Sequence, residues 1–249
     1  MKYPVEIEKS KKDRFLFTKE SLTSKKIEEN YITIEHRNFS KKCIAGLEPY
    51  HLGKYIGEGN GIVMEVCDPR NECPWVANII PIDDENHKKA LDNDVYFHKL
   101  MSDLGIATAY IYDYVCGNGF LWDPSDIKDV SILISERMNA NLGMYSWYYP
   151  EEFLLDYNDI YRMVMEKVIQ MNNYILHGML AFTKILVKID QNKRVEKVAI
   201  IEYYDARNIS DVPISKRRDD INTVNRIFQE LKEEALEILK RKRIDKTQI

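Results

Sequence analysis

The sequence has no long apolar run. Nowhere in its 249 residues do about 18 consecutive apolar side chains occur, so no segment is predicted to span a membrane. The N-terminal MKYPVEIEKSKKDRF also lacks the apolar centre of a signal peptide. These absences predict an intracellular protein, cytoplasmic or nuclear, with no membrane partner.

An excess of charge of one sign is also missing. The 36 Lys and Arg residues nearly balance the 40 Asp and Glu residues, and the net charge of -4 provides no general attraction to nucleic acid. The basic exceptions are the Lys-rich N-terminus and the run Lys240-Arg-Lys-Arg243. Short basic runs are usually solvated faces, so a nucleic-acid-binding accessory role ranks third among the functions considered.

Cysteine is scarce, and its spacing does not match a paired zinc-ligand motif. The chain has 4 cysteines. In a reducing compartment such residues are expected as packed thiols and not as disulfides. They are Cys43, Cys67, Cys73 and Cys116.

The first half of the chain has the pattern of a sheet with one helix. Residues 1–30 are polar and predict a partly ordered extension. Apolar positions at helical intervals predict one helix from about Asn86 to Leu104, with a left-handed cap at Gly105. β-Branched runs predict strands at 31–35, on both sides of a glycine turn within 55–66, and at 75–82, 109–116 and 130–138.

The second half is mainly helical. Pro150 opens a pattern that predicts one long helix as far as Met171, and a second long helix is expected from Asp219 to Arg243. A hairpin over residues 182–204 lies between them, and residues 244–249 are expected to be a tail. The two halves together predict an α+β fold.

Residues 174–207 contain the most informative motif. His177-Gly178 precedes a short hairpin that ends in Glu202-Tyr203-Tyr204. This arrangement resembles the catalytic loop and metal-binding triplet of protein kinases with their chemical groups replaced. Met179 stands at the position of the catalytic aspartate. Ala181 and Lys184 replace the loop lysine and the metal-binding asparagine, and Glu202 begins the altered triplet.

The resemblance covers about residues 50–235, and the motifs follow the kinase order. Its motif variants are most similar to those of the vaccinia-related and casein-kinase-like branch. An origin in a large DNA virus would be consistent with this similarity. The resemblance implies a bilobal protein-kinase-like fold. Residues 31–138 would form a β-rich N-lobe with one helix, and residues 139–243 a shortened helical C-lobe.

The nucleotide-binding part of the resemblance is incomplete. Gly57, Gly59 and Gly61 resemble a phosphate-covering glycine loop that is one residue short, and an ordinary glycine hairpin is the alternative. The segment from Ile134 through Glu136 to Met138 resembles the hinge, whose backbone binds adenine. Such backbone contacts do not depend on side-chain identity, so an adenine slot can survive these substitutions.

Two positions that would grip phosphate are also altered. The resemblance aligns Asn78 with the phosphate-binding lysine and Asp94 with the helix glutamate that pairs with it. Asn78 carries no charge, although an Asn–Asp hydrogen bond could still dock the helix. A solvated helix residue is the alternative interpretation of Asp94.

The catalytic positions lack the groups that phosphoryl transfer needs. Met179 supplies no base, and Ala181 supplies no positive charge. Lys184 would repel a metal ion but could contact phosphate directly, and Glu202 is a weak metal candidate. Tyr204 in place of glycine should restrict the backbone. For His177 a packing role is favoured over a replacement base.

The expected function is therefore that of a catalytically inactive pseudokinase that regulates or scaffolds a protein partner, such as an active kinase or a kinase substrate. No cofactor is expected, and any ATP binding would be weak and independent of metal. The alternative is an atypical phosphotransferase or nucleotide-binding switch. An aromatic cluster is a candidate partner interface, with internal packing as the alternative; its members are Tyr145, Trp147, Tyr148 and Tyr149.

Overall fold

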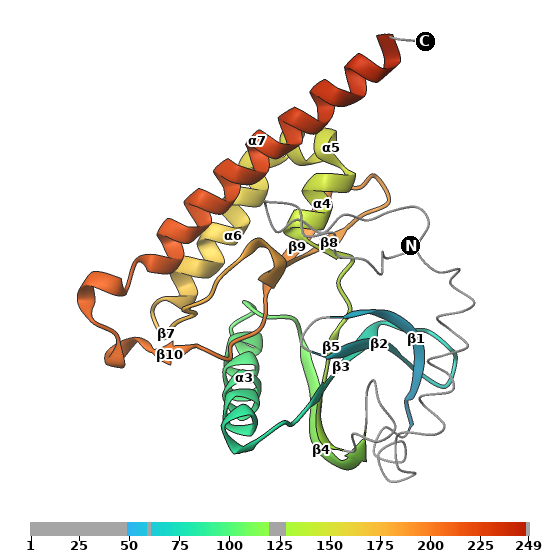
Figure 1. The fold of residues 1–249 in the computed structure, drawn as a ribbon, viewed down its shortest axis with the longest axis vertical. Coiled ribbons are helices and arrows are strands. Elements are labelled where there is room, and N and C mark those ends of the chain that lie inside the picture. The colour runs from blue at the N-terminus through green and yellow to red at the C-terminus, as the bar shows by residue number, and fades with distance from the viewer. Residues whose placement is uncertain (1–48, 59–60, 120–127, 248–249) are drawn as a thin grey trace. The chain divides into compact units, whose positions relative to one another are not determined.

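A computed structural model describes residues 49–58, 61–119 and 128–247 (Figure 1). The expected extension over residues 1–30, the strand at 31–35, and Cys43 lie outside these residues. The fold is mixed α+β, with antiparallel sheet and several helices. In the described parts of the chain, no helix has both the length and the apolarity needed to cross a membrane.

The chain divides into two compact units. Unit 1 contains the described parts of Met1–Lys88 and Ile111–Arg137, and unit 2 those of Lys89–Tyr110 and Met138–Ile249. One division therefore follows Arg137, within the segment that resembles a hinge. The helix expected within an N-lobe groups mostly with unit 2 instead.

Unit 1 is built on a five-stranded sheet in the order β1-β2-β3-β5-β4. Pairing is antiparallel between β1 and β2, β2 and β3, and β3 and β5. Alternate residues of β2 are buried in a small apolar core, as expected for a sheet with one covered face. The strands are β1 (His51–Glu58), β2 (Ile62–Cys67), β3 (Trp75–Pro81), β4 (Tyr110–Gly119) and β5 (Lys128–Glu136).

Two of the four cysteines do not follow the sequence-based expectation. Cys67, at the end of β2, forms a disulfide with Cys73, so these two residues are not packed thiols. The loop between them folds back on itself, because the backbone N–H of Asp68 donates to the carbonyl of Glu72 at 2.9 Å. The prediction of packed thiols considered cysteine count and spacing only. It did not anticipate the turn over residues 68–72, which brings the two sulfur atoms together.

Helix α3 (Glu85–Asp103) ends as its sequence predicts. Gly105 has φ +70°, and the N–H of Ile106 donates to the carbonyl of Met101 at 2.8 Å. This is the left-handed glycine cap expected at the end of the helix. The cap directs the chain from α3 back into the apolar core of unit 2, where Met101 and Ile106 are fully buried.

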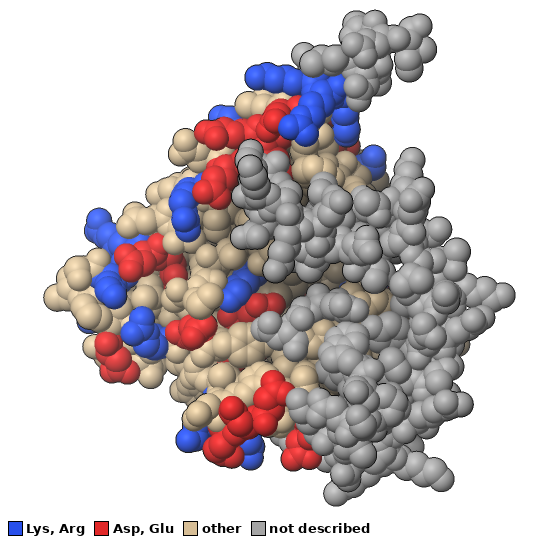
Figure 2. All heavy atoms as spheres, viewed as in Figure 1, with Lys and Arg blue, Asp and Glu red and all other residues tan. Residues whose placement is uncertain are grey.

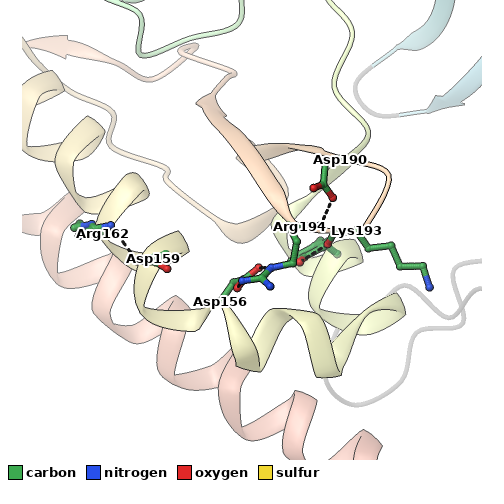
Figure 3. A network of polar contacts seen from close by, with 7 residues as sticks. Asp156, Asp159, Arg162, Asp190, Lys193 and Arg194 are labelled. Carbon is green, nitrogen blue, oxygen red and sulfur yellow. Dashed lines mark hydrogen bonds and ion pairs between the residues drawn. The ribbon is translucent and has the colours of Figure 1, made fainter.

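The single long helix expected after Pro150 is two helices. Helix α5 (Pro150–Leu155) ends at Asp156, and α6 (Tyr157–Met171) starts directly after it. The Asp156 carboxylate binds the Arg194 guanidinium through both oxygens (Figure 3). Aspartate favours helix ends because its side chain can bond to nearby backbone groups. The ion pair with Arg194 fixes the position of Asp156 and so stabilises the break between the two helices.

The hairpin that carries Arg194 completes a small sheet in unit 2. Its order is β6-β8-β9, with β6 (Ala140–Asn141), β8 (Ile185–Ile189) and β9 (Val195–Ile200). A second small pair joins β7 (Ile175–Leu176) to β10 (Arg207–Asn208). Short 3-10 turns occupy Phe182–Lys184, Ile209–Asp211 and Ile214–Lys216.

Two further helices complete the described part of unit 2. Helix α4 (Leu142–Tyr148), which the periodicity analysis missed, is capped by the side chain of Asn141, which accepts from the Met144 N–H at 2.8 Å. Helix α7 (Asp219–Thr247) continues past the expected end at Arg243, so part of the predicted tail is helical. Aromatic side chains from α5, α6 and α7 pack in one core, among them Phe153, Tyr157 and Phe228.

Candidate functional site

The candidate site is the loop after β9, residues Ile201–Ala206, which we call the 201–206 loop. Helix α3 holds this loop through two adjacent side chains. The Asp94 carboxylate accepts a hydrogen bond from the backbone N–H of Tyr203. Next to it, the Asn93 amide donates to the carbonyl of Tyr204 at 3.0 Å. Both sides of the contact belong to unit 2, so the loop and most of α3 form one compact structure.

Asp94 is a buried acid. Only 4% of the residue is exposed, so the interpretation as a solvated helix residue is wrong. Burial raises the pKa of Asp94 to about 7, and the nearby Glu202 carboxylate adds to the increase, while the Tyr203 N–H and Lys184 oppose it. The Asp94 carboxyl group is therefore expected to change charge near neutral pH. One of its oxygens also accepts the hydrogen bond from the Tyr203 N–H.

Sequence reasoning missed Asn93. Besides Tyr204, its amide lies within hydrogen-bonding distance of the carbonyls of Tyr203 at 3.3 Å and Ala206 at 3.2 Å. Three carbonyls converge on one amide group, which explains a half-buried asparagine on this helix. The available signal was the Asn-Asp pair in the middle of a helix, because both residues have poor helix propensity and often serve a specific contact.

Glu202 adopts an unusual backbone conformation. Its φ is +64°, a left-handed value that non-glycine residues seldom adopt. Its carboxylate lies 3.7 Å from the Lys184 ammonium, and both side chains are largely shielded from solvent. Burial raises the pKa of Glu202, and Lys184 opposes the increase. The unusual backbone conformation in this loop therefore occurs at Glu202, two residues before Tyr204, where the sequence predicted a restriction.

Tyr203 anchors the loop in the core. It is fully buried, and its hydroxyl donates to the carbonyl of Ile200 at 2.8 Å. Its ring lies between two buried histidines, with centroid distances of 5.2 Å to His177 and 6.1 Å to His98. The His98 ring in turn contacts the Thr108 side chain at 3.1 Å. The loop is therefore fixed by packing as well as by its contacts with α3.

His177 has a structural position. It is fully buried, and burial lowers the pKa of His177 to about 4. Its Nε2 lies 3.0 Å from the carbonyl of Ile201, which requires Nε2 to carry the proton. The remaining lone pair, on Nδ1, is buried without a hydrogen-bond partner. A neutral ring enclosed in this way packs and binds backbone, as expected for the favoured interpretation.

Asp220 supports the same turn from the start of α7. Its carboxylate accepts from the backbone N–H of His177 at 2.7 Å and of Gly178 at 3.3 Å. Gly178 has φ +82°, and a side chain there would lie 3.1 Å from the carbonyl of Asp205. Burial raises the pKa of Asp220, and the two N–H groups oppose the increase. The sequence placed Asp220 at a helix start but did not indicate this role.

The other altered loop positions lie close to these groups along the chain. Met179 is 57% exposed and carries no acid or base. Ala181 is half-buried immediately before the 3-10 turn that contains Lys184. The structure therefore brings together Lys184, Glu202 and Asp94, which influence one another electrostatically.

The remaining predicted site residues are divided between the units. Asn78 lies in β3 of unit 1, paired in register with Val63 and Leu133. Glu136 ends β5 in unit 1, and Met138 begins the second segment of unit 2. Because the contacts described above all lie within unit 2, they do not include these residues.

The glycine turn has a packing requirement. A side chain at Gly61 would lie 2.1 Å from the carbonyl oxygen of Ile79, so only glycine fits against β3. Gly57 meets no such obstacle, and Gly59 lies outside the described residues. The fit at Gly61 agrees with the ordinary-hairpin alternative and leaves phosphate binding a prediction.

The predicted aromatic interface is divided between core and surface. Tyr145 is fully buried, and its hydroxyl donates to the carbonyl of Lys193 at 2.8 Å, so this residue follows the packing alternative. Trp147 and Tyr149 are half-buried, and Tyr148 is 40% exposed. Tyr148 is therefore the most accessible member of the cluster.

Chemically, the site around the 201–206 loop contains two buried acids and one partly buried acid, and each of them contacts another group of the chain. Asp94 binds the loop backbone, Asp220 binds the turn at His177, and Glu202 pairs with Lys184. Comparison with models of known protein families and with curated proteins finds no match to this chain.

Proposed function

We propose that this chain is a catalytically inactive, protein-kinase-like protein that acts by binding a protein partner, such as an active kinase or a kinase substrate. The proposal combines the motif order in the sequence with the internal use of the polar groups around the 201–206 loop. A bilobal kinase-like arrangement is part of this proposal.

The pairing of Lys184 with Glu202 is the observation that carries the proposal. In the resemblance, these two positions would hold metal ions that neutralise the charge on phosphate. In this chain, an ammonium group lies 3.7 Å from the carboxylate. A fixed cation at this distance neutralises Glu202 and repels a divalent ion, which removes a large electrostatic contribution to phosphoryl transfer.

The environments of Met179 and His177 also support the proposal. Met179 offers only a thioether where a base would be needed, and the His177 ring is buried and hydrogen-bonded to backbone. General-base catalysis contributes typically about 10²–10⁴-fold, and neither side chain supplies it in this conformation. A protein partner is proposed because binding does not require these missing groups.

Nucleic acid is a weaker candidate than protein. On the face in Figure 2, Lys and Arg side chains lie among Asp and Glu side chains over the described surface. Such mixing provides no extended positive field to attract a polyanion. The balanced composition leads to the same expectation.

Thermal unfolding with ATP, in EDTA and in Mg²⁺, tests the proposal together with a phosphate-transfer assay on protein acceptors. We expect no transfer and no Mg²⁺-dependent increase in Tm. Mg²⁺-dependent transfer that is lost in Lys184→Met but retained in Lys216→Met, an exposed control, would overturn it. A metal-independent increase in Tm that Lys184→Met abolishes would assign Lys184 to a non-catalytic nucleotide site.

A further inference from the structure

Unit 1 contains a cluster of metal-ligand side chains that the proposed function does not use. The carboxylate of Glu65 and the sulfur atoms of Cys67 and Cys73 all lie within 4.8 Å of one another. Glu65 and Cys67 are two residues apart on β2, and therefore project from the same face of the strand. Cys73 reaches this face from the loop before β3, where it is bonded to Cys67.

The loop that carries Cys73 is well ordered by its own hydrogen bonds. The Asp68 carboxylate accepts from the N–H groups of Arg70 at 2.8 Å and Glu72 at 3.0 Å. Asn71 adopts a left-handed φ of +61°, and its N–H donates to the carbonyl of Asp68 at 2.9 Å. These contacts do not involve the disulfide, so they can keep Cys73 near Cys67 when the sulfur–sulfur bond is broken.

The neighbouring strand leaves space for the cluster. Gly53 of β1 lies against it, and a side chain there would approach the Cys67 sulfur to 2.7 Å and the Glu65 Cβ to 3.0 Å. A side chain at position 53 would therefore push into Cys67 and Glu65, two of the three ligand residues. Gly53 therefore lies directly against Glu65 and Cys67, on the same face of the sheet.

We propose that Cys67, Cys73 and Glu65 form a redox-gated site for a thiophilic divalent cation of the Zn²⁺ class. The disulfide closes the site, and the reduced form binds the metal through two thiolates and one carboxylate. Thiolate and carboxylate are established Zn²⁺ ligands, with bonds of about 2.3 Å and 2.0–2.2 Å. Tetrahedral ligands at that range lie roughly 3.5–3.8 Å apart. The three ligand atoms lie within 4.8 Å of one another, and the two sulfur atoms, which are bonded in this structure, would have to move apart to that spacing after reduction.

The redox step balances with an external dithiol as reductant. The dithiol transfers two electrons and two protons, becomes a disulfide, and leaves Cys67 and Cys73 as thiols. Binding of the cation then releases both thiol protons, because the thiolate is the ligand. Two thiolates and one carboxylate bring three negative charges to a doubly charged metal, which leaves one net negative charge at the site.

Arg137 opposes metal binding in this scheme. Its guanidinium donates to one oxygen of the Glu65 carboxylate, and the backbone N–H of Lys54 donates to the other at 3.3 Å. The cation must therefore displace or share an existing partner of Glu65. Removal of the Arg137 charge should make the carboxylate more available and strengthen metal binding.

His51 is the candidate for a fourth ligand. It pairs in register with Cys67 across the antiparallel β1–β2 ladder, and such partners lie on the same face of the sheet. His51 is exposed, so rotation of its side chain is sterically cheap. Without His51, water would take the fourth position, as in open zinc sites.

Titration of the full-length chain with Zn²⁺, and with Co²⁺ as a spectroscopic probe, tests the proposal. The oxidised protein should bind neither ion at this site. After reduction with a phosphine, removal of the reductant and exclusion of oxygen, one equivalent should bind, and Co²⁺ should show thiolate charge-transfer absorption. Because the same protein is compared in two redox states, this result does not depend on a variant that folds.

Variants then assign the ligands. Cys73→Ser should abolish the charge-transfer signal of a two-thiolate site, and Glu65→Gln should lower affinity about 10-fold or more. Arg137→Gln should raise the affinity, and the control Glu72→Gln, which changes an exposed carboxylate in the same loop, should leave it nearly unchanged. Equal metal binding by oxidised and reduced protein, or unchanged binding in Cys73→Ser, would overturn the proposal, as would the lack of any binding after reduction.

Discussion

Asp156 and Asp94 are buried to almost the same extent, but their charges are compensated in different ways. Asp156 is 5% exposed and Asp94 is 4% exposed. Both oxygens of Asp156 face the Arg194 guanidinium, whereas Asp94 accepts from a backbone N–H and lies near a second acid, Glu202. One region of unit 2 thus pairs its buried acid with a cation, and the other holds its buried acid through a backbone N–H, next to the Lys184–Glu202 pair.

The two regions differ in how many cations lie near their acids. Around Arg194, Asp156 has a cation directly opposite it, as Figure 3 shows, and the neighbouring Lys193 lies 3.8 Å from Glu152. The same turn is held by the Arg194 N–H, which donates to the Asp190 carboxylate at 2.8 Å. At the 201–206 loop, Lys184 is the cation that acts on both Glu202 and Asp94. Burial raises the pKa of both acids, Glu202 raises the pKa of Asp94 further, and Lys184 opposes both increases.

Removal of Arg194 should have the largest effect. Arg194→Met leaves the Asp156 carboxylate buried without its cation. Because the Arg194 side chain is itself 47% exposed, we expect a loss at the lower end of the range for buried pairs, about 3 kcal/mol in the free energy of unfolding. Urea denaturation measures this loss. Arg162→Met is the matched control, because Arg162 pairs with Asp159 at the surface, where both side chains are more than 60% exposed.

The surface control should change stability by less than about 1 kcal/mol. Adding Asp156→Asn to Arg194→Met should recover part of the loss, because the neutral amide needs no cation. If Arg194→Met lowered the free energy of unfolding no more than Arg162→Met, the two ion pairs would be equivalent. The claim that Arg194 compensates the buried charge of Asp156 would then be wrong.

Asn93→Ala should have an intermediate effect. It removes the amide shared by the carbonyls of Tyr203, Tyr204 and Ala206. We expect a loss of about 1–3 kcal/mol in the free energy of unfolding. Hydrogen–deuterium exchange should also accelerate locally in the 201–206 loop. Asn86→Ala, an exposed position on the same helix, should leave both measurements nearly unchanged.

At low pH, Asp94→Asn should change the free energy of unfolding least among these variants. The difference from wild type should grow as the pH rises. The folded-state pKa is about 7, against an ordinary value of 3.8. Between these pH values the unfolded chain releases the proton before the folded chain does, so the wild-type protein loses stability as pH rises. Asp94→Asn removes this titration, and its stability relative to wild type should increase from pH 4 to 7 and then level off.

Urea denaturation of both proteins at several pH values measures this difference, in which the contributions of titrating groups that do not interact with Asp94 cancel. Asp92→Asn, at an exposed position on the same helix, provides the control and should show no such trend. A difference between Asp94→Asn and wild type that is constant from pH 4 to 8 would contradict the assignment of Asp94 as an acid with a raised pKa.

Local sequence signals predicted local features of this fold. The cap at Gly105 was predictable because a left-handed turn after a helix favours glycine. The strand at 75–82 was close to the observed β3, since β-branched runs between turn residues indicate strands. The alignment of His177 with a packing role also agrees with its buried position.

Other features of the site depend on partners far away in the chain. Asn93 contacts carbonyls more than 100 residues later, and no spacing rule connects them. The break at Asp156 is stabilised by Arg194, 38 residues away, so helix periodicity alone predicted one continuous helix. Pairings of this kind follow from the return of the chain in three dimensions.

The sequence by itself determined the α+β class, the main helices and strands, and the substitutions at Met179, Ala181 and Lys184, because these depend on residue identity and local periodicity. Only the tertiary structure decided that Cys67 bonds to Cys73, that Asn93 and Asp94 hold the 201–206 loop, and that Lys184 neutralises Glu202. The physical reason is that bonding and charge compensation act through space, between groups that the folded chain brings together.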